Sequence, residues 1–90
     1  MTVERSLRIV NENGLHARPA AEIVKVAARF ASEITLAKDS LVVNAKSIMG
    51  VMMLAAEFGS TVVVRATGDD ANEAVAALAD VVTNRFGELA

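Results

Sequence analysis

The stretch NENGLHARPAA, residues 11–21, decides the fold because it predicts where a strand ends and a helix begins. Asn13-Gly14 is a strong turn signal, and Pro19 suits the first turn of a helix, where a missing N–H costs nothing. The apolar residues that follow recur with the 3.6-residue period of one helix face: Ala20, Ile23, Val24 and Ala27. We therefore expect a helix from about Ala17 to Phe30.

The only histidine of the chain, His16, lies at the start of this helix. There, unpaired backbone N–H groups point outward and the helix dipole presents partial positive charge, so the helix end favours anions. A neutral imidazole at this place is a nucleophile, and N–H groups around Ala17 and Arg18, with the Arg18 guanidinium, would hold its negatively charged adduct. The pattern indicates a carrier of a phosphoryl group. The simpler alternative is that His16 caps the helix and that Arg18 is an ordinary surface charge.

The other elements are predicted from the alternation of apolar and polar residues and from turn residues between them. Four segments alternate apolar and polar residues and are predicted strands: Val3–Val10, Glu33–Lys38, Leu41–Ala45 and Thr61–Thr67. The polar triplet Lys38-Asp39-Ser40 predicts a hairpin between the second and third strands.

Two further helices are expected. Ser47 is a good N-cap for a short helix from Ile48 to about Ala56. Asp70 and Glu73 have the spacing of a capping box for a last helix that runs to about Phe86, where Gly87 can end it. The residues expected on its buried side are Ala74, Leu78, Val81 and Val82.

The resulting order is β-α-β-β-α-β-α. Alternation within the strands implies a sheet with one exposed face and one face covered by helices, which is a two-layer α+β fold. Ninety residues, 53% of them hydrophobic and 22% charged, make one globular domain over residues 1–90.

The composition argues against several classes of function. The net charge of −2 argues against nucleic acid as a partner, and one histidine without cysteine argues against a metal centre. We expect no cofactor. The start of the chain lacks the order of a signal peptide, and its longest apolar run, Ile48–Ala56, is about half of what a bilayer requires. We expect a cytoplasmic monomer that does not insert into membranes.

Two motifs carry a family resemblance. GLHARPA, residues 14–20, closely resembles the phosphorylation site of HPr, the histidine-containing phosphocarrier of the bacterial phosphoenolpyruvate-dependent sugar phosphotransferase system. NAKSIMGVM, residues 44–52, is similar to the regulatory-serine segment of the same family. The resemblance covers nearly the whole chain. It implies an open-faced β-sandwich with a four-stranded antiparallel sheet in the order 1-4-2-3 and three helices on one face.

The resemblance also implies roles for residues. His16 is expected to accept phosphate through Nδ1, assisted by Arg18, with phosphorylated enzyme I as donor and the sugar-specific A domains of permeases as acceptors. Ser47 matches a serine that HPr kinase/phosphorylase modifies in many members, and transcriptional regulators are further possible partners. A purely structural role as the cap of the short helix is also a sufficient explanation of Ser47.

The short helix is apolar almost all round, so one side is expected to stay exposed. Val51, Leu54 and Ala55 are the expected core residues, and Ile48, Met49 and Met52 the expected docking patch, because methionine adapts to several partners. By periodicity alone the methionines fit the core equally well. Lys25 and Arg29 would steer acidic partners, although each singly is an ordinary surface charge.

Two other functions remain open. One is a nitrogen-related or regulatory HPr paralogue with the same chemistry and other partners. The other is an interaction module that uses the Ile48–Met52 patch without carrying phosphate, which would need neither His16 nor Arg18. A stand-alone enzyme is disfavoured because the sequence shows no acid–base pair.

Overall fold

The computed structural model describes all residues, Met1–Ala90, and confirms the element order predicted from the sequence. The elements are β1 (Thr2–Arg8), α1 (Ala17–Ala27), β2 (Glu33–Lys38), β3 (Leu41–Asn44), α2 (Ile48–Met53), β4 (Thr61–Thr67), α3 (Ala71–Thr83) and a final 3-10 turn, η1 (Arg85–Gly87). Two strands differ slightly from their expected bounds. β1 begins one residue early and ends two residues early, and β3 ends one residue early.

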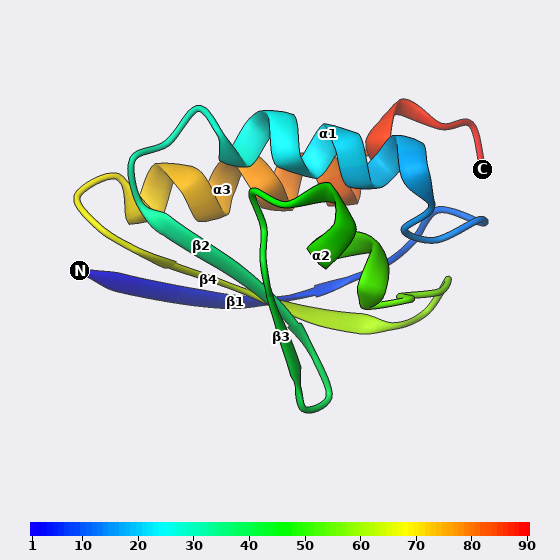
Figure 1. Cartoon of the computed structure of the whole chain (residues 1–90). Helices are drawn as coiled ribbons and strands as arrows, with labels where there is room; N and C mark the ends of the chain where they lie inside the picture. The colour runs from blue at the N-terminus through cyan, green and yellow to red at the C-terminus, as the bar shows by residue number, and fades with distance from the viewer.

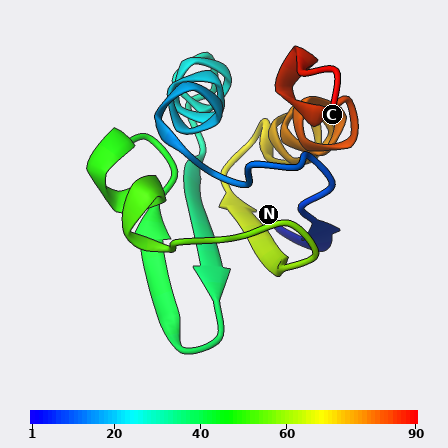
Figure 2. The same ribbon diagram turned by 90° about the vertical axis from the view of Figure 1, so that its right-hand side faces the viewer.

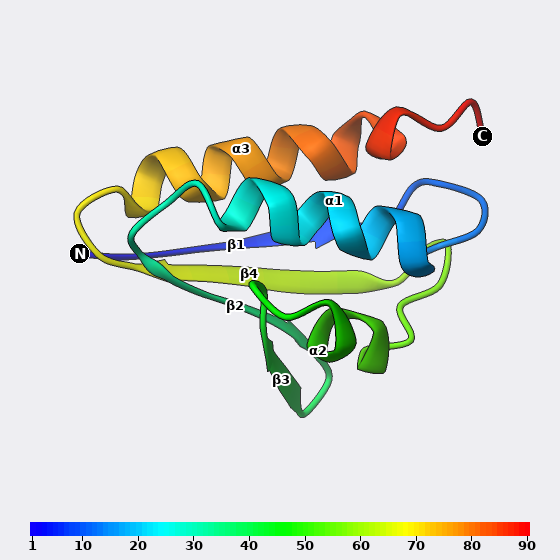
Figure 3. The ribbon, with the colours of Figure 1, turned by 45° about the horizontal axis from the view of Figure 1, so that its top comes forward.

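The four strands form one antiparallel sheet in the order β1-β4-β2-β3, which confirms the expected 1-4-2-3 order. All three helices lie over the same face (Figure 1, Figure 2). α1 and α3 lie side by side along the sheet, and α2 lies beside α1 next to the β2–β3 hairpin (Figure 3). The fold is therefore the two-layer open-faced sandwich.

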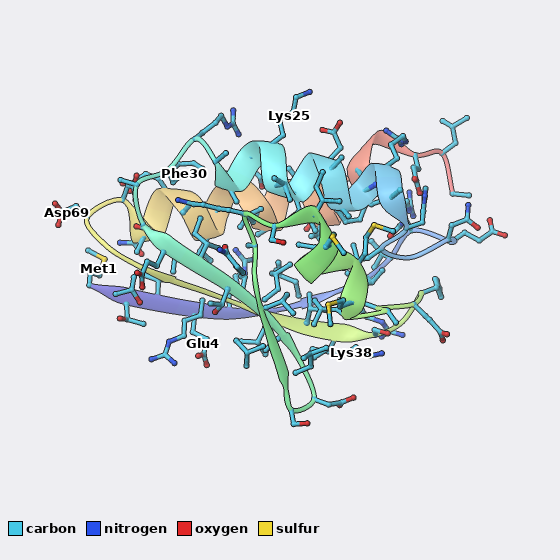
Figure 4. The ribbon with its side chains drawn as sticks, in the orientation of Figure 1. Met1, Glu4, Lys25, Phe30, Lys38 and Asp69 are labelled. Atoms are coloured by element: carbon cyan, nitrogen blue, oxygen red, sulfur yellow. The ribbon has the colours of Figure 1, made fainter.

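The strand register explains the two faces. Leu7 pairs with Val62, and Leu36 pairs with both Val64 and Val43, so large apolar residues stand opposite one another beneath the helices. On the other face Glu4 pairs with Arg65, and both are exposed. Glu4 projects from the sheet away from the helices (Figure 4). One face of the sheet is thus core and the other is open.

The core is built mainly from small and β-branched residues between the sheet and the helices. Its largest completely buried apolar side chains are Ile9, Ile23, Ile34, Val51, Val62, Val64 and Leu78. Ala20, Ala27, Ala74, Leu78 and Val82 are buried as predicted. Val24 and Val81 are only partly buried and pack at its margin, while Val26 takes the more buried place on α1.

The first and last α-helices end three residues before the expected positions. α1 stops at Ala27 because Arg29 and Phe30 donate to Val26 and Ala27, in the tighter three-residue pattern. α3 stops at Thr83.

α2 also ends early, and the expectation that Ala55 belongs to the core was wrong. Ala55 has φ = 49°, which turns the chain out of the helix, so Ala55 is exposed and Ala56 is buried in its place. Lys38 Nζ binds the carbonyl oxygens of Leu54 and Ala55 at 3.5 and 3.3 Å. A lysine from β2 thus satisfies carbonyl groups that the end of a helix leaves unpaired.

The predicted capping box at Asp70 was also wrong. Asp70 occupies the N-cap position of α3, but its side chain makes no capping bond. Its carboxylate instead accepts hydrogen bonds from the N–H groups of Ala31 and Ser32, at 2.8 and 3.0 Å, and from the Ser32 hydroxyl. These donors hold the pKa of Asp70 below its ordinary value, with the Ser32 hydroxyl contributing most. Asp70 therefore joins the loop after α1 to the start of α3.

Candidate functional site

His16 occupies the N-cap position of α1, as the sequence predicted. Its backbone is extended (φ −78°, ψ −172°) and its side chain makes no capping bond, while its carbonyl oxygen accepts the first helical bond from Ala20 N at 3.0 Å. The imidazole is 42% exposed. The ring therefore stands at the helix start, open to solvent, and does not cap the helix.

The loop before His16 is fixed from two sides. Gly14 has φ = 66°, and a Cβ there would lie 2.5 Å from the Ala56 carbonyl oxygen, so this position requires glycine. Leu15 N donates to the same oxygen at 2.9 Å, and the Asn11 amide donates to Gly14 O at 2.8 Å. These contacts hold the His16 loop against the segment that follows α2.

Two backbone donors beside His16 have no partner in the protein. The N–H groups of Ala17 and Arg18 make no hydrogen bond to a backbone or side-chain acceptor, and Pro19, which has no N–H, is buried. The first exposed donors of α1 are thus free for an anion, and the helix dipole adds to their attraction.

Arg18 lies beside this helix start with its side chain 53% exposed. Its NH2 group donates to the Phe86 carbonyl oxygen at 3.2 Å and lies 3.5 Å from Glu88 Oε2. The structure therefore brings His16 and Arg18 together, as the motif led us to expect, and links both to the C-terminal segment.

The link is Glu88, which sequence reasoning missed. Glu88 Oε2 lies 2.8 Å from His16 Nε2, and Glu88 Oε1 accepts a hydrogen bond from Asn11 Nδ2 at 2.9 Å. Only 14% of the Glu88 side chain is exposed. The hydrogen bond from Asn11 does most to hold the pKa of Glu88 below its ordinary value, and the hydrogen bond and charge of His16 and the charge of Arg18 act in the same direction.

The turn that precedes Glu88 has an unusual backbone conformation and positions Glu88 beside His16. Arg85, Phe86 and Gly87 have φ values of 55°, 55° and 78°, so three successive residues are left-handed. Two of them carry a Cβ, for which this conformation is costly. Burial of the Phe86 side chain and the bond from Arg18 to its carbonyl oxygen hold the turn. The turn and the loop before α1 lie at the same end of the molecule (Figure 1, Figure 2).

A shallow hollow of about 240 Å³ adjoins His16. It is lined by Asn13, Leu15, His16, Ala55, Ala56 and Glu57. The hollow therefore connects the histidine with the C-terminal end of α2, which carries the second motif.

Ser47 caps α2, as the sequence predicted. Its Oγ accepts a hydrogen bond from Gly50 N at 3.1 Å. Ile48, Met49 and Met52 are exposed, as the docking hypothesis expected, and Met53 is exposed as well. We call Ile48, Met49, Met52 and Met53 the α2 patch. Val51 and Leu54 are buried, as predicted.

Lys25 and Arg29 are both exposed but lie away from the histidine. Lys25 projects outward from the last turn of α1 (Figure 4), and at 1.5 Å per helical residue it lies about 13 Å along the axis from His16. Arg29 follows the end of α1, and its guanidinium stands 5.9 Å from the centre of the Phe30 ring. Neither cation belongs to the immediate surroundings of His16.

The structure contains no group of three or more His, Cys, Asp or Glu side chains that could hold a metal ion. None of its helices combines the length and the apolar character that crossing a membrane requires.

Comparisons with known proteins identify the family of the chain. A family model described as "PTS HPr component phosphorylation site" matches residues 3–84. The phosphocarrier protein HPr of Cupriavidus necator is 46% identical over 86 residues, which are 96% of this chain and 97% of that protein.

Solved structures show the same fold. The crystal structure of an HPr from Thermoanaerobacter tengcongensis matches with a TM-score of 0.94 and 48% identity, over 98% of this chain and 99% of that one. The catabolite repression protein Crh of Bacillus subtilis, described as a domain-swapped dimer, matches with a TM-score of 0.75 and 44% identity over 92% of this chain and 95% of that one. The expectation that this chain is a monomer therefore stays a prediction. By sequence and by fold, the chain belongs to the HPr family of phosphocarrier proteins of the phosphotransferase system.

Proposed function

We propose that this chain accepts a phosphoryl group on Nδ1 of His16 from phosphorylated enzyme I and passes it to the A domains of sugar permeases. In the first step the Nδ1 lone pair forms a bond to phosphorus while the bond between phosphorus and its carrier on enzyme I breaks, and the electron pair of that bond stays with enzyme I. The second step repeats this exchange with the permease domain as acceptor.

The observation that carries the proposal is the pair of unpaired N–H groups of Ala17 and Arg18 beside an exposed imidazole. A phosphoryl group on His16 would bring about two negative charges to a helix start with free donors. The Arg18 guanidinium stands on the same side, within reach of the His16 partner Glu88. Phosphoryl transfer needs mainly positioning and charge neutralisation, and these groups supply both.

A carrier must also release its phosphate. The Arg18 side chain is 53% exposed, so solvent weakens its attraction for a phosphate. It already binds the Phe86 carbonyl oxygen and approaches Glu88, and part of that interaction is given up when it turns to a phosphate. Both effects keep the phosphorylated and free forms close in free energy, which onward transfer requires.

Docking of enzyme I and of the permease domains is assigned to the α2 patch. Four exposed apolar side chains on one short helix form a surface of the kind that protein partners cover. The hollow beside His16 is lined by Ala55, Ala56 and Glu57, which follow α2 in the chain, so the helix that carries this patch ends near the phosphorylation site. Lys25 and Arg29 lie farther out and would act on the approach of acidic partners.

Regulation at Ser47 is the second part of the proposal. Ser47 lies next to Ile48 at the edge of the α2 patch, and its Oγ holds the cap of α2. A phosphate from HPr kinase/phosphorylase would place about two negative charges beside an apolar docking surface. Such charges weaken docking by desolvation and repulsion while the fold is kept.

The regulatory alternative differs only in its partners. The similarity to Crh, a catabolite repression protein, favours a regulatory role for this chain. Transcriptional regulators would then bind the same α2 patch. A nitrogen-related paralogue would use the same chemistry at His16. In each case the partners place the protein in the cytoplasm.

The experiment is a labelling assay. The wild-type protein is incubated with enzyme I and phosphoenolpyruvate that carries labelled phosphorus, and the label is tested for loss in acid and retention in base. Because the chain has one histidine, His16→Ala should remove this label completely, and Arg65→Ala, on the open face of the sheet, is the control for loss of an exposed side chain. Label that survives His16→Ala would disprove the assignment.

A further inference from the structure

The Glu88 carboxylate is an acceptor only. Its pKa lies below the ordinary value for glutamate, so at neutral pH the group is ionised and has no hydrogen to donate. The 2.8 Å contact between Glu88 Oε2 and His16 Nε2 therefore requires a hydrogen on Nε2. In a neutral ring with Nε2–H, the lone pair is on Nδ1.

Glu88 is held in place by groups other than His16. Asn11 is completely buried, and its Nδ2 binds Glu88 Oε1 at 2.9 Å and Gly14 O at 2.8 Å. Both partners are acceptors, which fixes the amide orientation of Asn11. The left-handed turn of Arg85, Phe86 and Gly87 sets the direction in which the chain presents Glu88.

We propose that Glu88 is a positioning residue for phosphoryl transfer: its carboxylate holds His16 through Nε2–H, directs the Nδ1 lone pair to the phosphorus, and stabilises the positive charge that the ring gains. This inference rests on the proposed function of His16. The same arrangement occurs in catalytic sites where a carboxylate binds one nitrogen of a histidine and orients the other nitrogen for reaction.

The charge balance of the step follows from the contacts. When Nδ1 bonds to phosphorus, the ring keeps its Nε2 hydrogen and becomes cationic, so the hydrogen bond to Glu88 becomes a bond between charged groups and strengthens. Arg18, at 3.5 Å from Glu88 Oε2, has the longer contact of the two and turns to the phosphate. The negative charge of Glu88 also repels the phosphate, which limits the stability of the phosphorylated form.

The surrounding charges are few. Asn11 is neutral, and the charged or titratable side chains that meet the Glu88 carboxylate are His16 at the start of α1 and Arg18 two residues later. No other ion pair to Glu88 is present. An effect of replacing Glu88 is therefore attributable to these two partners.

The test compares Glu88→Ala and Glu88→Gln with the wild type. Transfer from enzyme I is measured at saturating and limiting carrier, and the ring is observed by 15N NMR in the unphosphorylated protein. For Glu88→Ala we expect the maximal rate to fall about tenfold, the size of one lost charge-assisted hydrogen bond at a partly exposed site, with KM changed less than about twofold. Glu73→Ala, which removes an exposed carboxylate on α3, is the control and should transfer at the wild-type rate.

The spectroscopic result separates positioning from a structural role. In the wild type we expect a protonated, slowly exchanging Nε2 and an unprotonated Nδ1. Glu88→Gln keeps an acceptor oxygen, so it should keep this signature and recover part of the rate, whereas Glu88→Ala should lose the slow exchange. Wild-type rate and exchange in Glu88→Ala would overturn the inference while His16 still takes up label. Absence of label on His16 in the wild type would instead overturn the proposed function.

Discussion

Glu88 and His16 stand 72 positions apart in the chain, yet their side chains meet at 2.8 Å. The contact joins the C-terminal segment to the N-cap of α1. Asn11, from the loop before α1, holds the other oxygen of the same carboxylate. The loop before α1, the N-cap of α1 and the C-terminal segment therefore meet around the imidazole.

The first prediction concerns the loop before His16. Gly14→Ala would place a Cβ 2.5 Å from the Ala56 carbonyl oxygen in a left-handed backbone, so we expect it to lower the free energy of unfolding by more than about 2 kcal/mol. Gly87→Ala is the matched control, because Gly87 is left-handed but has no atom within 4 Å of such a Cβ. It should lose only about 1 kcal/mol. Equal losses in urea denaturation would show that the contact with Ala56 is unimportant.

The second prediction concerns pH. The pKa of Asp70 lies below its ordinary value because donors from Ser32 and Ala31 favour the ionised form. Its contribution to stability is therefore present above the pKa of the unfolded chain, near 4, and is lost as the pH falls through the lower folded value. The gap in unfolding free energy between wild type and Asp70→Asn should be constant near neutral pH and should shrink below about pH 4.

Asp69→Asn controls for that measurement. Asp69 is the neighbouring residue, is exposed, and points away from the fold in Figure 4. It should leave the unfolding free energy almost unchanged at each pH. A gap for Asp70→Asn that widened on acidification would contradict the sign of the argument.

The third prediction separates two effects of Ser47. Ser47→Ala removes the acceptor of the Gly50 N–H bond and should cost about 1 kcal/mol of stability. Ser47→Asp keeps an acceptor at the N-cap, so it should be more stable than Ser47→Ala. Its charge beside the α2 patch should nevertheless raise the KM for enzyme I. If Ser47→Asp docks like the wild type, phosphorylation of Ser47 has no electrostatic effect on docking.

The fourth prediction concerns the α2 patch. Met49 is 76% exposed, so Met49→Lys should scarcely affect folding but should raise the KM for enzyme I about tenfold, which corresponds to about 1.4 kcal/mol of lost docking energy. Val42→Lys is the control, because Val42 is 61% exposed on β3, outside the patch. A change of KM for Val42→Lys as large as that for Met49→Lys would mean that docking does not depend on the α2 patch.

The features that could be predicted from the sequence are those that local residue patterns encode. Alternation located the four strands, and the Asn13-Gly14 turn with the apolar spacing after it located α1 and placed His16 at its start. Helix ends were less predictable, because the positive φ of Ala55 and the carbonyl contacts from Lys38 are set by packing against β2. Asp70 looked like a local cap, but donors 38 and 39 positions away hold its carboxylate instead.

The site was predictable in part for the same reason. His16, Arg18 and Ser47 lie in short motifs whose spacing carries the chemistry. Glu88 lies in no motif, and its place beside His16 depends on a left-handed turn at two residues that are not glycine. The buried amide of Asn11 contacts Glu88 only in the folded chain. Contacts between residues so far apart in the chain form only in the tertiary structure.

The most direct test of the central claim is an NMR measurement on the protein after phosphorylation by enzyme I and phosphoenolpyruvate. Long-range correlations between the ring protons and nitrogens of His16 show which nitrogen is bonded to phosphorus. We expect phosphorus on Nδ1 and hydrogen on Nε2, the nitrogen that Glu88 holds at 2.8 Å. Phosphorus on Nε2, or on a residue other than His16, would contradict the account.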